Sequence, residues 1–141
     1  MSILLIAALF WVSGADLATL KAEPDLEKRS DKALEFANRD LDQVRDDYRA
    51  GNIEQAKEAL NEVREAVDLS YDSLKQTGKD PRKHPKHFKK AELKVRELLR
   101  RLRGLSDQAS FLDRPAFDPV VKRLQEVHDE LLSGIMGKKD E

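Results

Sequence analysis

Residues 41–60 read LDQVRDDYRAGNIEQAKEAL, and they decide the fold because two apolar stripes meet there at Gly51-Asn52. Glycine readily takes the left-handed conformation that ends a helix. Asparagine favours the cap position of the next helix, and Gln55 stands where its capping-box partner belongs. Before the break, residues three and four apart form the stripe Ser30, Leu34, Ala37, Leu41, Val44 and Tyr48. After it, the same spacing gives Ile53, Ala56, Leu60, Val63, Val67, Tyr71 and Leu74. Both stripes therefore have the period of an amphipathic helix.

Two further stripes follow a polar, basic connection. The third consists of Phe88, Ala91, Val95, Leu98, Leu102, Leu105, Ala109 and Leu112. The fourth consists of Phe117, Val120, Leu124, Val127, Leu131 and Ile135. Prolines and glycines fall between or near the ends of these segments, with Gly104 as an interior exception. The sequence predicts helices over about 24–50, 53–77, 85–112 and 118–136.

The predicted fold class is all-α. Helices of similar length with short connections run antiparallel, which predicts an up-down-up-down four-helix bundle over residues 24–136. Residues 16–23 are predicted to be a linker, and residues 137–141 a disordered tail. Pro24 is expected as the first helical residue of the bundle.

Composition limits the possible functions. Charged residues make up 38% of the 141-residue chain and aromatic residues 6%, which suits long amphipathic helices. The net charge of −1 indicates no bulk attraction to nucleic acid or to a membrane. Because the chain has no cysteine, disulfides, thiolate metal sites and thiol catalysis are excluded.

The amino-terminal segment resembles a secretory signal. Residues 3–12 are unbroken apolar sequence, about 15 Å of helix and too short to cross a bilayer. Small residues at Ser13 and Ala15 fit a signal peptidase, so we expect a signal peptide over 1–15 with cleavage after Ala15. No Lys or Arg precedes the apolar run, which keeps open an uncleaved anchor as the alternative. Export to the periplasm or outside the cell is predicted, with no transmembrane span in the mature chain.

The hairpin turn also resembles part of a tetratricopeptide repeat. The resemblance covers about a dozen residues and rests on Tyr48, Gly51-Asn52-Ile53, Ala56 and Leu60. It implies a helical hairpin that binds other proteins. The consensus Trp and Gly upstream are missing, and no second copy occurs at a 34-residue period. An ordinary helical hairpin explains the same residues.

No residue pattern indicates catalysis, a cofactor or a metal. His84 and His87 are three residues apart, but two ligands do not complete a metal site, so we expect them to be solvated. His128 lies beside the fourth stripe and is expected to reach solvent rather than hold haem, since no methionine stands early in the first helix. The carboxylates are expected to follow the solvent faces of the helices.

Charge is unevenly distributed along the chain. Residues 75–103 hold twelve Lys or Arg against three Asp or Glu, and residues 16–74 hold nine against sixteen. At 100° per residue, a basic face of the third helix comprises Lys86, Lys89, Lys90, Leu93, Arg96, Arg100 and Arg103. An acidic face of the second helix comprises Glu54, Glu58, Glu62, Glu65, Asp68 and Asp72. These faces can simply be solvated, with their edge members paired across helix seams, or they can bind a partner.

Three functional hypotheses follow. The first is a non-catalytic exported interaction or scaffold protein of the periplasm or cell envelope, with a protein partner or self-association. The second is a module that binds a polyanion or an anionic surface through the basic face. Nucleic acid is disfavoured, because no aromatic side chains alternate with the basic ones. The third is a cofactor-carrying bundle or an enzyme with an unrecognised site.

Overall fold

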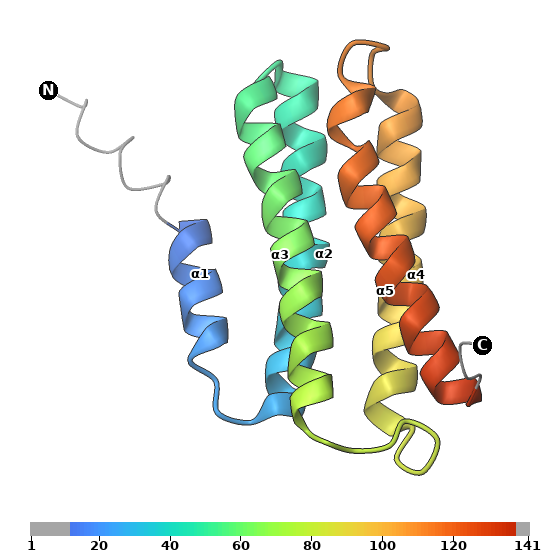
Figure 1. Ribbon diagram of the computed structural model, residues 1–141. Coiled ribbons are helices and arrows are strands. Elements are labelled where there is room, and N and C mark those ends of the chain that lie inside the picture. Colours follow the sequence, from blue (N-terminus) through green and yellow to red (C-terminus); the bar gives the residue numbers. More distant parts are fainter. Residues whose placement is uncertain (1–11, 138–141) are drawn as a thin grey trace, which may run out of the picture.

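The computed structural model describes residues 12–137, with side chains from Leu17 onward. Over these residues the chain is all-helical and has no strand, which confirms the predicted fold class (Figure 1). Four of its five α-helices are long. The elements in chain order are α1 (Val12–Lys21), α2 (Leu26–Ala50), α3 (Ile53–Gln76), α4 (Lys86–Gln108), the 3₁₀ turn η3 (Arg114–Ala116) and α5 (Asp118–Met136).

The turn between α2 and α3 has the predicted conformation. Gly51 has φ 81°, in the left-handed region, and its backbone N–H donates to the carbonyls of Asp47 and Tyr48. Asn52 precedes α3 as expected, but its side chain makes no capping hydrogen bond. At the other end, α2 begins at Leu26 rather than Pro24, because Asp25 is the cap and accepts from the backbone N–H groups of Glu27 and Lys28.

The long helices form two hairpins side by side. Helices α2 and α3 pack closely against each other, α4 packs on α5, α2 also packs on α4, and α3 also packs on α5. Helices α2 and α4 run in one direction, whereas α1, α3 and α5 run in the other (Figure 1). The connection between α3 and α4 therefore joins two helices that lie diagonally across the body.

One apolar core joins all four long helices. Its largest fully buried side chains come from every long helix and from the connection before α5: Leu34, Leu41, Leu60, Leu74, Leu98, Leu102, Phe117, Leu124 and Leu131. The ring of Phe117 stacks on that of Tyr48 with centroids 5.2 Å apart, which ties the 114–117 turn to the end of α2. None of the described helices combines the length and apolarity needed to cross a bilayer.

The predicted linker over 16–23 is wrong for most of its length, because α1 continues to Lys21. Leu17 and Leu20, three residues apart, are buried in the core cluster, so the segment gains apolar contacts that a linker would not make. The turn after α1 is fixed by the Arg29 Nε–H, which donates to the carbonyl of Glu23 at 2.8 Å. Most of the predicted signal peptide, residues 1–11, and the tail residues 138–141 lie outside the described residues.

The third predicted helix is too long at its carboxyl end. Helix α4 passes through Gly104 but stops at Gln108, because Ala109 adopts an extended conformation. Leu112, placed in the core stripe by its spacing, is 86% exposed. The early break lets the chain turn through η3 and return Phe117 to the core, where it is fully buried.

Candidate interaction surface

The predicted basic face lies on the outside of α4. All seven of its members are exposed, and Leu93 at its centre is 56% exposed. The face spans residues 86–103, about 26 Å of helix. A large apolar side chain surrounded by cations is thus presented to solvent along one side of the molecule.

Some cations of this face are bound to neighbouring side chains. Lys90 Nζ lies 2.7 Å from Asp31 of α2, and this hydrogen bond raises the pKa of Lys90. Arg96 and Arg100 bond to Glu92 and Glu97 on their own helix, and Arg103 donates to Gln125 of α5. Within residues 12–137, Lys86 and Lys89 make no ion pair, so this end of the face has free positive charge.

A basic pocket of about 410 Å³ lies at the start of α4. It is lined by Glu27, Lys79, His84, Pro85, Lys86, His87 and Lys89. Glu27 accepts from Lys79 and lies beside His87, each at 3.0 Å, so its charge is already neutralised. The first turn of α4 contains no acidic residue and Pro85 provides no side-chain cap, so the positive end of the helix dipole adds to the lysine charge.

The two histidines of this region have different surroundings. His84 is exposed, as predicted. His87 is half-buried and paired with Glu27, so the expectation that it would be solvated is wrong. No group of three potential metal ligands occurs in the described part of the chain.

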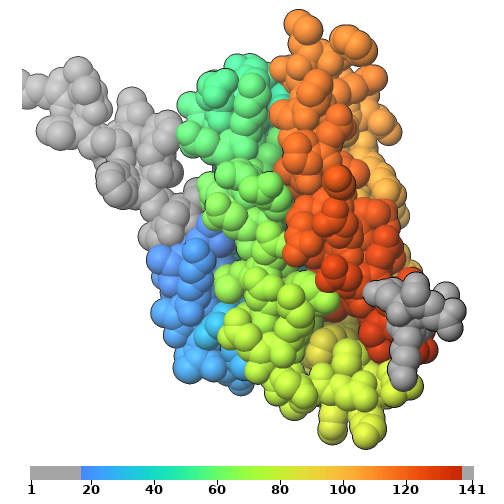
Figure 2. Space-filling model, in the orientation of Figure 1, coloured from blue at the N-terminus to red at the C-terminus, as the bar shows by residue number. Residues whose placement is uncertain are grey.

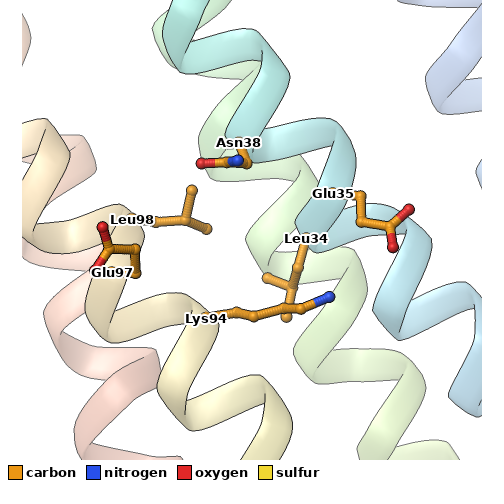
Figure 3. A pocket seen from close by; sticks show the side chains of 6 residues that line it. All are labelled: Leu34, Glu35, Asn38, Lys94, Glu97 and Leu98. Atoms are coloured by element: carbon orange, nitrogen blue, oxygen red, sulfur yellow. The ribbon is translucent and has the colours of Figure 1, made fainter.

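A smaller hollow of about 140 Å³ lies beside the basic face, in the seam between α2 and α4 (Figure 3). Its floor is formed by Leu34 and Leu98, and its rim by Glu35, Asn38, Lys94 and Glu97. Lys94 reaches from α4 toward α2 in this view. The hollow extends the apolar surface near Leu93 only slightly, because both leucines of its floor belong to the core.

The predicted acidic face of α3 is only partly a solvent face. Glu54, Glu58, Glu65 and Asp72 are exposed. Glu62 and Asp68 are half-buried, and Asp68 accepts from Arg123 Nε of α5 at 2.6 Å. This ion pair closes the seam between α3 and α5.

A buried ionic cluster between α4 and α5 was not predicted. Glu92 is only 4% exposed, and its Oε1 lies 2.9 Å from His128 Nε2 and 3.1 Å from Arg96 Nε. Burial would raise the pKa of Glu92, but hydrogen bonds from Arg96 and His128 outweigh it and hold that pKa below its usual value. His128 is largely buried, so the prediction that it reaches solvent is wrong. The only sequence signal is the i, i+4 spacing of Glu92 and Arg96.

A second buried acidic group lies on the α2–α3 hairpin. Asp40 and Asp47 are each 7% exposed and lie two helical turns apart on α2, with Glu62 of α3 nearby. Burial, and then the charges of Glu62 and Asp47, raise the pKa of Asp40 to about 7. Asp47 accepts from Gln43 Nε2 at 3.0 Å. The expectation that carboxylates follow the solvent faces fails at these positions.

These arrangements are charged surfaces and internal ion pairs of the described residues. Comparison of the chain with protein-family models, curated proteins and solved structures gave no match. The exposed chemistry of α4 is therefore the feature from which a function can be inferred.

Proposed function

We propose that this chain is a non-catalytic, exported interaction or scaffold protein of the cell envelope, built as an antiparallel four-helix bundle. Its contact surface is the basic face of α4, and its partner is a protein with an acidic surface. The observation that carries the proposal is the exposure of Leu93 among cations, two of which, Lys86 and Lys89, are unpaired within the described residues. Charge directs such a partner to the face, and an apolar centre adds contact area.

For localisation we propose export with the amino-terminal segment left attached. Helix α1 runs without a break from Val12 across Ala15 to Lys21, and Leu17 and Leu20 are in the core. Cleavage after Ala15 would leave six residues of this helix. This supports the uncleaved anchor over the cleaved signal, and the intact mass of native protein from an envelope fraction distinguishes them.

The contact surface is tested by charge reversal at cations that do not support the interior. The variant is Lys86→Glu/Lys89→Glu/Arg100→Glu, and Arg96 is left unchanged because it binds the buried Glu92. The matched control, Lys28→Glu/Lys57→Glu/Lys122→Glu, makes the same change in net charge at exposed lysines of α2, α3 and α5.

Parent and both variants are used to capture proteins from a native envelope fraction. We expect the parent and the control to capture the same partner, and the α4 variant to lose it. Loss should also occur for the parent in high salt, since exposed charge contacts are screened. Equal capture by all three proteins would show that the basic face is not the contact surface.

The pocket at the start of α4 favours a second candidate, binding of an anionic polymer or lipid headgroup. Lys86 and Lys89 line it together with Lys79, and the helix dipole has the same sign. Retention on vesicles containing phosphatidylserine, lost in the α4 variant and in high salt, would favour this candidate. Protein capture without vesicle retention would favour the first.

A further inference from the structure

The basic face of α4 and the exposed carboxylates of α3 lie on opposite sides of the molecule. Helices α3 and α4 are diagonal to each other across the body, and the apolar core lies between them (Figure 1). Figure 2 shows the outer side of α3, coloured green, on the near side, while α4 is largely hidden behind α5. The two charged faces therefore point away from each other, and each is available to another molecule.

Both faces contain charges that have no ion pair in the described part of the chain. On α3, the exposed Glu58 and Glu65 have none, whereas the exposed Asp72 lies 3.3 Å from Lys75 on its own helix. On α4, Lys86 likewise has no ion pair among the described residues. Charges of opposite sign that are left without partners on two faces can direct those faces toward each other.

The two faces also have the same spacing. Members of the basic face recur at intervals of seven residues, about 10 Å of helix, at Lys86, Leu93 and Arg100. Exposed carboxylates of α3 recur at the same interval, at Glu58, Glu65 and Asp72. Seven residues are close to two helical turns, so each set follows one side of its helix.

Contacts with α2 fix the relative heights of the two faces. Ser30 Oγ of α2 lies 2.7 Å from Ser70 Oγ of α3, and the adjacent Asp31 binds Lys90 of α4. Residue 70 of α3 and residue 90 of α4 are therefore at similar heights along the body. Since α3 and α4 run in opposite directions, residues that follow one another up α4 are level with residues that follow one another back along α3 (Figure 1).

Counted from this level, Lys86 is close to the height of Asp72, and Arg100 is close to the height of Glu58. Two copies placed side by side in the same orientation, α4 of one against α3 of the next, thus bring opposite charges together at both positions. Leu93 lies between these positions and adds apolar contact area. The two helices are antiparallel in this contact, so their dipoles attract each other.

We propose that copies of this chain associate side by side, with the basic face of α4 on one copy against the exposed carboxylates of α3 on the next. The inference rests on the proposed function and identifies its acidic partner as a second copy. The net charge of −1 gives little overall repulsion between copies. Because the two faces differ and point in opposite directions, each added copy leaves one face of each kind free. The assembly is therefore an open-ended row.

Sedimentation velocity of the purified full chain, in low and in high salt, tests the proposal with one variant for each face. The variants are Lys86→Glu/Lys89→Glu/Arg100→Glu for the basic face and Glu58→Lys/Glu65→Lys/Asp72→Lys for the acidic one. The matched controls make the same changes in net charge at exposed side chains of α2 and α5: Lys28→Glu/Arg39→Glu/Lys122→Glu and Glu35→Lys/Asp46→Lys/Glu126→Lys. Circular dichroism checks that all of them remain helical.

We expect the parent and both controls to form species of graded size in low salt and to dissociate in high salt, since exposed charge contacts are screened. Each face variant alone should be monomeric. An equimolar mixture of the two face variants should associate again, because the reversed face of one matches the reversed face of the other. A small fraction of either variant should shorten the rows of the parent, since it can bind at one end only.

A monomeric parent in low salt, a mixture of the face variants that stays monomeric, or equal association of parent and face variants would overturn the proposal. The acidic-face variant distinguishes this failure from failure of the proposed function, because its basic face is unchanged. If the parent is monomeric but this variant still captures a foreign protein from the envelope fraction, only self-association fails. If reversing the basic face changes neither capture nor association, both proposals fail.

Discussion

Asp40 is a carboxylate buried in the interior of the protein. Its pKa is raised to about 7, first by burial and then by Glu62 and Asp47. In an unfolded chain an aspartate has a pKa near 3.9, so between these values the folded protein holds a proton that the unfolded chain releases. Stability contributed by this proton is present at low pH and is lost as pH rises from about 4 through about 7.

Asp40→Asn should therefore stabilise the protein at pH 8 and have little effect near pH 4. The largest gain is about 4 kcal/mol, from a shift of about three pKa units. Urea unfolding of parent and variant at pH 4 and pH 8 measures it, with the exposed Asp46→Asn on the same helix as control. A gain that is the same at both pH values, or that Asp46→Asn shares, would contradict the assignment.

The burial and the partners of individual side chains were the hardest features to predict from the sequence. The spacing of α4 identified Phe88, Leu98 and Leu102 as core, and they are buried. It could not identify Glu92 as buried, because its partner His128 is 36 residues away on α5 and meets it only when the hairpin has formed. A carboxylate on the edge of a stripe faces solvent or a neighbouring helix depending on packing, which one helix does not encode.

At the scale of elements, periodicity predicted the long helices and the hairpin turn. The missed helix α1 and the overlong prediction for α4 both concern short segments, in which few residues define a stripe. Leu17 and Leu20 are too few to indicate a helix, and Leu112 kept the right spacing beyond the end of α4. In both cases contacts with the rest of the molecule decided the conformation. Leu17 and Leu20 of α1 are buried in the core, and the early end of α4 lets the chain return Phe117 to the core.

The α2–α3 turn permits a test of backbone conformation alone. An added Cβ would contact nothing within 4 Å at either Gly51 or Gly104, but only Gly51 has a positive φ. Gly51→Ala should lower the free energy of unfolding by about 1 kcal/mol or more, whereas Gly104→Ala inside α4 should raise it by about 0.5–1 kcal/mol. Urea denaturation of the two variants gives both values. The same sign for both would show that the left-handed turn does not limit Gly51.

At the scale of the whole molecule, the order of the helices around the core decides which charged helix faces lie next to each other. Consecutive helices α3 and α4 carry faces of opposite sign, but they lie diagonally across the body. The cations of α4 instead meet α2, through Lys90–Asp31 and through Arg101, whose Nη2 lies 2.6 Å from Asp42. The sequence determines the faces of each helix but not which helices become neighbours, because short connections allow either arrangement.

The packing of α4 against α2 buries Leu98 in the core and leaves Leu93 of the proposed contact surface exposed. One matched pair of variants tests this orientation of α4. Leu98 faces Leu34 across this seam and is almost fully buried, whereas Leu93 on the same helix is mostly exposed. Leu98→Ala should lower the free energy of unfolding by about 2–5 kcal/mol, and Leu93→Ala by less than about 0.5 kcal/mol. Chemical denaturation compares them, and circular dichroism checks that both variants remain helical. If Leu93→Ala cost as much as Leu98→Ala, Leu93 would lie inside the body. The basic face could not then surround an exposed apolar centre, and the partner surface would have to be sought elsewhere.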